Sequence, residues 1–199
     1  LCAQEVTEHR FSDLLEHAAF DWGVLSLHHN LRLSGSSDSE RLGVAVFGRA
    51  PSRLRSSEVL HDLPYPEKFI AASVDLGREH VTYPVTVASY HARPSPEKGR
   101  ATLAVAHYFE LNLGPSILGL DANSPDIDHP DHEQSRYHWR HAPFAHCEPA
   151  LIGARPLRRH RMDDAFRRFL TDADMDQIRS ERPSGPLAVT YDRDKAPDT

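Results

Sequence analysis

The sequence contains few cysteines and no long hydrophobic run. Cys2 and Cys147 are the two cysteines among its 199 residues, too few for a disulfide framework or a cysteine metal site. A reducing compartment is compatible with this count, so we slightly favour a cytoplasmic location. No apolar run reaches the length of a membrane span and no signal peptide is visible, so we expect no membrane span.

Positive net charge is also lacking. The formal net charge is −6 at pH 7, which argues against a surface devoted as a whole to nucleic acid. Arginine nevertheless accounts for 20 of the 23 basic residues, and its guanidinium suits bidentate contacts to phosphate. Seven basic or potentially basic side chains lie between Arg155 and Arg168, where a solvated helix face and a binding surface are both open explanations.

The length of the chain and its 15 prolines favour one loop-rich α/β domain over a helical bundle. Thr7 is the predicted N-cap of a helix over residues 8–20, and Ser95 that of a second helix beginning at Pro96. The second helix has a predicted buried face of Ala101, Ala104, Val105, Tyr108 and Leu111. Apolar patterns predict strands over residues 1–5, 22–27, 42–48, 68–76, 83–90 and 117–120.

The remaining segments carry weaker signals. The strands over residues 22–27 and 42–48 are expected to pair like a hairpin, and residues 49–66 are predicted to be irregular. Beyond Asn123 the sequence is loop-like, with predicted helical segments at 134–140 and 162–170 and a last strand at 187–191. We therefore expect a single domain over residues 1–191 and a frayed polar tail over 192–199.

The stretch from Pro115 to Asn123 is the strongest candidate for a functional site. Its apolar run reads as a buried strand that stops at Asp121, and Asn123 follows two residues later, on the same side of an extended chain. A carboxylate at the end of a buried strand needs a partner, and a metal ion is a common one.

Two more strands end in polar side chains. A strand–helix–strand unit over residues 82–121 predicts parallel strands, so His91 and Asp121 should leave the sheet at one edge. Glu5 ends a strand just before a helix and fits the same edge, where ligand and catalytic groups gather in such sheets.

These strand ends resemble the motifs of the endonuclease/exonuclease/phosphatase superfamily. The matching stretches are Leu-Cys-Ala-Gln-Glu5, Leu-Gly-Val-Ala-Val-Phe-Gly-Arg49, Val-Ala-Ser-Tyr-His91 and Ile-Leu-Gly-Leu-Asp-Ala-Asn123, in the family's order over most of residues 1–125. The resemblance implies a deoxyribonuclease-I-like four-layer α/β sandwich and a Mg²⁺- or Mn²⁺-dependent phosphoesterase. Its substrate would be a phosphate ester of nucleic acid, of a lipid head group or of a small metabolite.

The sequence departs from this family at both ends. Nothing before Leu1 corresponds to the family's first strand with its Asn, and no Asp-His motif closes the chain. Tyr191-Asp192-Arg193 is only superficially similar to such a motif, because a polar segment follows it. We expect a fragment with impaired activity, or else a catalytically degenerate protein.

The resemblance also implies roles for individual residues. Glu5 and Asp121 would hold the metal, and Asp121 would orient or deprotonate the attacking water. Asn123 would hold the phosphate or the metal's water, and His91 would donate a hydrogen bond to the phosphoryl oxygen. The alternatives are a first-turn acid for Glu5, an Asx turn for the Asp121 and Asn123 pair, and a structural histidine for His91.

Other polar residues are candidates for substrate contacts. Arg93 is placed to touch a substrate phosphate, although a solvated loop arginine is the simpler explanation. Arg136 and Trp139 could clamp a substrate, or belong to a lid that packs on the core. The histidine-rich loop over residues 129–146 matches no zinc spacing, and residues 121–131 lack the central glycine of an EF-hand.

The sequence thus leaves two main functions open. The first is metal-dependent hydrolysis of phosphate esters, and the second is a non-catalytic module that binds nucleic acid or a partner through the basic cluster between Arg155 and Arg168. A zinc protein that uses the histidine-rich loop is a third reading.

Overall fold

The computed structural model describes residues 1–29, 41–77, 84–93, 95–112 and 114–121, together with residues 173 and 177. The chain divides into two units, Leu1–Asn123 and Ser124–Thr199, and the helices and strands described below lie in the first. The predicted segments at 134–140, 162–170, 187–191 and 192–199 lie outside the described residues. None of the helices in the described ranges is long and apolar enough to cross a membrane.

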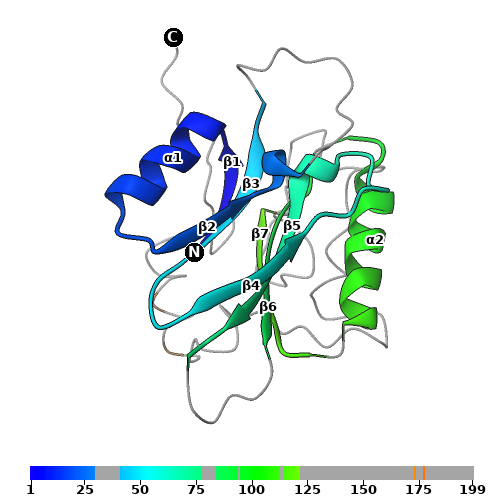
Figure 1. Ribbon diagram of the computed structural model, residues 1–199. Helices are drawn as coiled ribbons and strands as arrows, with labels where there is room; N and C mark the ends of the chain where they lie inside the picture. Colours follow the sequence, from blue (N-terminus) through cyan, green and yellow to red (C-terminus); the bar gives the residue numbers. More distant parts are fainter. Residues whose placement is uncertain are drawn as a thin grey trace. The chain divides into compact units, whose positions relative to one another are not determined.

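The first unit has a mixed α/β fold whose strands form two sheets (Figure 1). The first sheet has the antiparallel order β1 (Cys2–Val6), β3 (Gly43–Gly48), β2 (Trp22–Leu25). The pairing of β2 with β3 confirms the one predicted from the sequence, and a short 3₁₀ turn, η1 (Ser26–His28), follows β2.

The second sheet contains the strand–helix–strand unit. Its order is β4 (Arg53–Glu58), β5 (Phe69–Asp75), β6 (Val85–His91), β7 (Ser116–Asp121). The pair β6–β7 is parallel, as predicted, and the other pairs are antiparallel. The prediction that residues 49–66 are irregular is wrong, because β4 lies within them. This strand lies at the edge of the described sheet with mostly exposed polar side chains, so it has no apolar run to reveal it.

The start of the first helix agrees with the sequence and that of the second does not. α1 (Glu8–His17) begins after Thr7, whose Oγ1 accepts a hydrogen bond from the backbone N–H of Arg10 at 3.2 Å. α2 (Lys98–Leu111) begins two residues beyond Pro96. The predicted Ser95 cap is wrong: its carbonyl oxygen accepts from the Lys98 N–H, but its hydroxyl is buried with no hydrogen-bond partner among the described residues. A turn over residues 95–97 places this hydroxyl too early to cap the helix.

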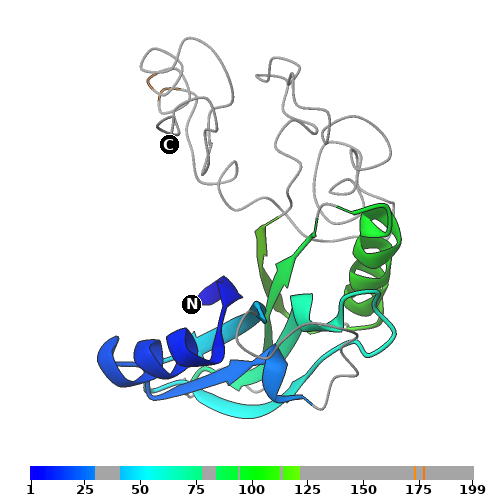
Figure 2. The same cartoon turned by 90° about the horizontal axis from the view of Figure 1, so that it is seen from above.

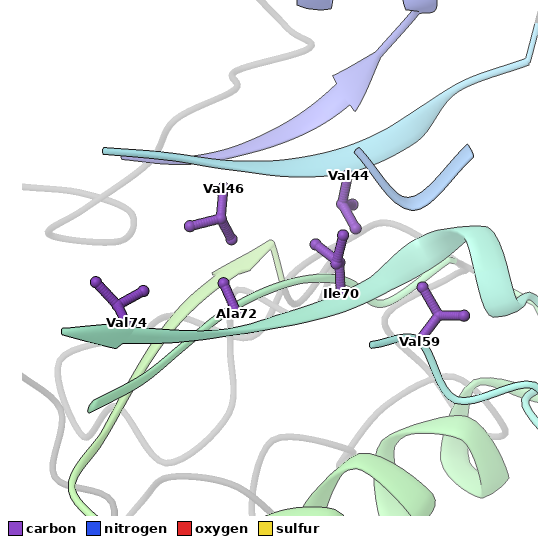
Figure 3. Packing of buried hydrophobic residues seen from close by; sticks show 6 residues of the cluster. All are labelled: Val44, Val46, Val59, Ile70, Ala72 and Val74. Carbon is purple, nitrogen blue, oxygen red and sulfur yellow. The ribbon is translucent and has the colours of Figure 1, made fainter. Parts of the chain in front are cut away.

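The two sheets pack face to face. Alternate side chains of β3 and β5 point toward one another, with Val44 and Val46 on one side and Ile70, Ala72 and Val74 on the other (Figure 3). These five side chains are at most 2 % exposed. Burying a valine or isoleucine in this way stabilises a fold by about 1.5–3 kcal/mol, so this layer is a main source of stability.

Each helix covers the outer face of one sheet (Figure 2). Phe11 of α1 stacks on Phe47 of β3 with ring centroids 5.1 Å apart. On the other side, Phe109 and Tyr108 of α2 pack edge-on against Phe69 of β5.

The predicted buried face of α2 is confirmed at Ala101 and Val105 and is wrong at Ala104 and Leu111. Leu111 is 71 % exposed and Ala104 is exposed, whereas Thr102 and Phe109 are buried. The buried Tyr90 hydroxyl shares a hydrogen bond of 3.0 Å with the Thr102 hydroxyl, so a polar contact selects this face.

Candidate functional site

Charged and polar side chains meet at one edge of the second sheet. The parallel register pairs His91 with Asp121, the last residues of β6 and β7. On the other side of β6, Phe69 pairs with Tyr90, and continuing this antiparallel register by one residue places Lys68 beside His91. Lys68, directly before β5, therefore lies in a row with His91 and Asp121 at the ends of β6 and β7.

The row lies on the face that meets the first sheet. The Lys68 ammonium donates to the carbonyl oxygen of Leu42, the residue before β3 of the first sheet. His91 shares its parity with Ser89, whose hydroxyl donates to the carbonyl oxygen of Ala3 in β1. The row thus lies at the margin of the layer between the two sheets.

His91 and Asp121 form a pair of unequal exposure. His91 is 6 % exposed, whereas the side chain of Asp121 is 47 % exposed. Nε2 of His91 lies 3.8 Å from Oδ2 of Asp121, which is too long for a good hydrogen bond. Nδ1 of His91 is buried and has no hydrogen-bond partner among the described residues.

The environment of His91 favours its neutral form. Burial lowers the pKa of the imidazole, Asp121 and the more distant Glu5 oppose this, and Lys68 and Arg93 add to it. A neutral imidazole carries one N–H donor and one acceptor nitrogen. His91 can therefore donate one hydrogen bond to an oxygen placed next to Asp121.

Glu5 reaches this edge through a β-bulge. Ala3 pairs with Ala45 and Val6 with Gly43, so β1 has one residue more than β3 between these pairs. Glu5 lies in this bulge with φ of 55°, in the left-handed region that a residue with a side chain rarely adopts. Both Ala3 and Val6 pack into the cluster around Phe11, although they are three residues apart.

The bulge changes what the Glu5 side chain faces. In an unbroken strand, Glu5 would share the face of Ala3 and point under α1. Here Glu5 is exposed and close enough to Lys68 and His91 to act on the pKa of both. Bulges often redirect a side chain next to a functional site, and the charge of this carboxylate acts on Lys68 and His91 at the edge of the second sheet.

Gln4 and Cys2 fix β1 against the second sheet. Nε2 of Gln4 donates to Oγ of Ser89 at 3.0 Å and lies 3.4 Å from the carbonyl oxygen of Gly119. Sγ of Cys2 donates to the carbonyl oxygen of Ala88 at 3.2 Å. A Cβ at position 119 would collide with Cys2, so the glycine permits this close approach. These contacts position Glu5, which follows Gln4. No role for Gln4 was predicted from the sequence.

Two cations lie at the same edge. Lys68 ends the 3₁₀ turn η3 (Pro66–Lys68) and is 8 % exposed, with its Nζ donating to the carbonyl oxygen of Leu42 at 2.7 Å. Arg93 is exposed, and its guanidinium lies 4.7 Å from the centre of the Tyr65 ring. The sequence predicted a substrate contact for Arg93 but missed Lys68. Its only signal was a lysine, one of three in the chain, directly before an apolar strand.

The described side chains limit the kind of metal site that this edge can form. Among the described residues, no group of three or more His, Cys, Asp or Glu side chains could hold a metal ion. Glu5 and Asp121 both expose their carboxylates, and Mg²⁺ is usually held by one or two carboxylates, with water completing its shell. These residues suit such a water-rich site and do not suit a closed site with protein ligands only.

The rest of the predicted site lies outside the described residues. This applies to Asn123, Arg136 and Trp139, to the histidine-rich loop over 129–146 and to the basic cluster between Arg155 and Arg168. Comparison with models of known protein families gives no match to this chain, and comparison with curated protein sequences gives none either.

Proposed function

We propose that this chain belongs to a metal-dependent phosphoesterase of the endonuclease/exonuclease/phosphatase type, with a deoxyribonuclease-I-like four-layer sandwich as its fold. The packing of α1, two sheets and α2 supports the fold. One observation carries the function. His91 and Asp121 are paired at the ends of parallel strands, and a bulge directs Glu5 toward them from the facing sheet.

Each of the three residues has a role that its surroundings support. Glu5 and the exposed Asp121 carboxylate would hold Mg²⁺ together with water. The bound ion would supply Lewis-acid polarisation of the phosphoryl group and a more acidic water. His91, neutral and held in place by burial, would donate its N–H to a non-bridging phosphoryl oxygen.

In the proposed hydrolytic step, one bond to phosphorus forms and one breaks. A water oxygen forms a bond to phosphorus while its proton passes to the Asp121 carboxylate, a general base that solvent can reach. The ester P–O bond breaks, its electron pair stays on the leaving oxygen, and solvent protonates that oxygen. The products are a phosphate group and an alcohol.

The test compares Glu5→Gln with Glu16→Gln, which removes an exposed carboxylate from α1. We expect Glu5→Gln to weaken Mn²⁺ and Mg²⁺ binding in calorimetry and to lower metal-dependent hydrolysis of nitrophenyl phosphate mono- and diesters. The loss should be at least about 10–100-fold, which even groups outside the metal's ligand shell can cause. Glu16→Gln should behave like the parent chain.

Two results would contradict the proposal. One is metal affinity that is the same in the parent chain and Glu5→Gln. The other is the absence of any metal-dependent hydrolysis by the parent chain, above all if it binds nucleic acid in a salt-sensitive manner that is indifferent to Mg²⁺. That second pattern would favour a binding module instead.

A further inference from the structure

Lys68 is a nearly buried cation that forms no ion pair with a carboxylate of the described residues. Its side chain is 8 % exposed, and its register position lies next to His91. Within the described ranges, no carboxylate oxygen lies within 4 Å of its ammonium, and its direct partner is the neutral carbonyl of Leu42. Glu5 and Glu67 act on it only over a longer range.

The hydrogen bonds of Lys68 leave donors unused. An ammonium has three N–H donors, and the Leu42 carbonyl accepts one of them at 2.7 Å. A buried charge that is not paired costs several kcal/mol, and an apolar side chain of similar volume would usually be more stable there. Packing therefore does not explain a lysine at this position, whereas an anion that enters the site would.

A second cation is held at the same edge. Arg93 follows His91 by two residues, and its guanidinium lies over the Tyr65 ring. The Tyr65 hydroxyl lies 3.4 Å from the Glu97 carboxylate, which helps to fix the ring. Arg93 also lies close enough to lower the pKa of Lys68, so the two cations approach the same space. Two cations beside one imidazole make a site for an anion with several oxygens.

We propose that the Lys68 ammonium is the anion-binding group of this edge and binds a non-bridging oxygen of a phosphoryl group, with Arg93 as the second contact. The choice of phosphate rests on the proposed function, whereas the need for an anion rests on Lys68 itself. Lys68 is thus a substrate-binding residue, and it holds the phosphoryl group next to His91 and Asp121.

The test uses inorganic phosphate and metal-free protein in the presence of a chelator. Calorimetric titration should show phosphate binding by the parent chain and at least tenfold weaker binding by Lys68→Met. Lys68→Arg should restore part of the affinity, because it restores the charge. Arg55→Met removes a cation near the opposite end of β5, where Arg55 pairs with Asp75, and should bind phosphate like the parent chain.

The proposal is wrong if the parent chain does not bind phosphate, or if Lys68→Met binds it equally well. Thermal unfolding without phosphate checks the fold, and we expect Lys68→Met to be as stable as the parent chain or more so. If Lys68→Met does not fold, Lys68→Gln carries the same comparison, because it also removes the charge and keeps a polar chain.

This experiment is separate from the test of hydrolysis because it contains no metal. Phosphate binding that depends on Lys68, without hydrolysis of any ester, would support the anion site and refute the phosphoesterase. Hydrolysis that depends on Glu5, with phosphate affinity indifferent to Lys68, would refute the anion site and support the phosphoesterase.

Discussion

The charged residues at the two ends of β5 differ in their burial and in their partners. At the end of the strand, Asp75 is partly exposed, accepts the Gly77 N–H at 3.0 Å and pairs with Arg55 at 3.1 Å. Before its start, Lys68 is nearly buried, and among the described residues its ammonium donates to the carbonyl oxygen of Leu42. Among the described residues, Asp75 has an ion-pair partner and Lys68 has none.

This difference distinguishes a charge that the fold itself stabilises from one that is available to bind a ligand. The Gly77 N–H and Arg55 lower the pKa of Asp75, so the fold itself favours that carboxylate. Burial lowers the pKa of Lys68, so the fold disfavours that cation. A charge that the fold disfavours is a candidate for a role in ligand binding, especially where His91 and the Glu5 bulge are adjacent.

The bulge at Glu5 gives the largest expected effect on stability. Glu5→Gly should raise the free energy of unfolding by about 1 kcal/mol, because glycine adopts positive φ without the clash of a Cβ. The same change removes the carboxylate and should weaken metal binding as Glu5→Gln does. Urea unfolding of both variants and the parent chain measures the effect.

Glu5→Gln is the matched control, since it retains the Cβ and should leave stability nearly unchanged. A Glu5→Gly variant that is less stable than the parent chain would show that the backbone at Glu5 is not strained.

As pH falls, protonation of His29 should lower the free energy of unfolding before protonation of Asp75 does. His29 follows η1 and shares a 3.2 Å hydrogen bond with Ser57, near the end of β4, while burial together with His61 and His28 lowers its pKa. In the folded protein, His29 therefore takes up a proton at a lower pH than in the unfolded chain, where its pKa is about 6.5. Stability should be full above about pH 6.5 and fall below it.

Urea unfolding between pH 7.5 and 3 measures how the free energy of unfolding falls with pH. His29→Gln should reduce the slope as pH falls below 6.5, to which His91 also contributes because burial lowers its pKa. Asp75→Asn should change the profile only as pH falls below about 4, since the pKa of Asp75 is lowered in the folded state. A slope just below pH 6.5 that His29→Gln leaves unchanged would contradict this prediction.

The sequence predicted the strand ends of the site better than their surroundings. The apolar runs before His91 and Asp121 stop at a polar residue, and a helix between them requires parallel strands, so their common edge followed from local patterns. The expectation that β7 is fully buried is wrong: Ile117 is 56 % exposed, because β7 is paired only with β6 among the described strands.

Long-range pairing decided what the sequence could not predict. Nothing in Ala3-Gln4-Glu5-Val6 marks a bulge, because no glycine occurs there and the bulge depends on the register with β3. Lys68 becomes a neighbour of His91 only through the pairing of β5 with β6. β4 has no apolar run, and its partner strand identifies it.

The most direct test of the site is paramagnetic broadening by Mn²⁺ in the ¹⁵N–¹H spectrum of the whole chain. The account predicts that the amide signals of Glu5, His91 and Asp121 broaden first, at substoichiometric Mn²⁺, while those of Asp75 and Gly77 remain sharp. Broadening that begins at Asp75 and Gly77, or that is equally weak at both ends of β5, would contradict the assignment of this edge as the functional site.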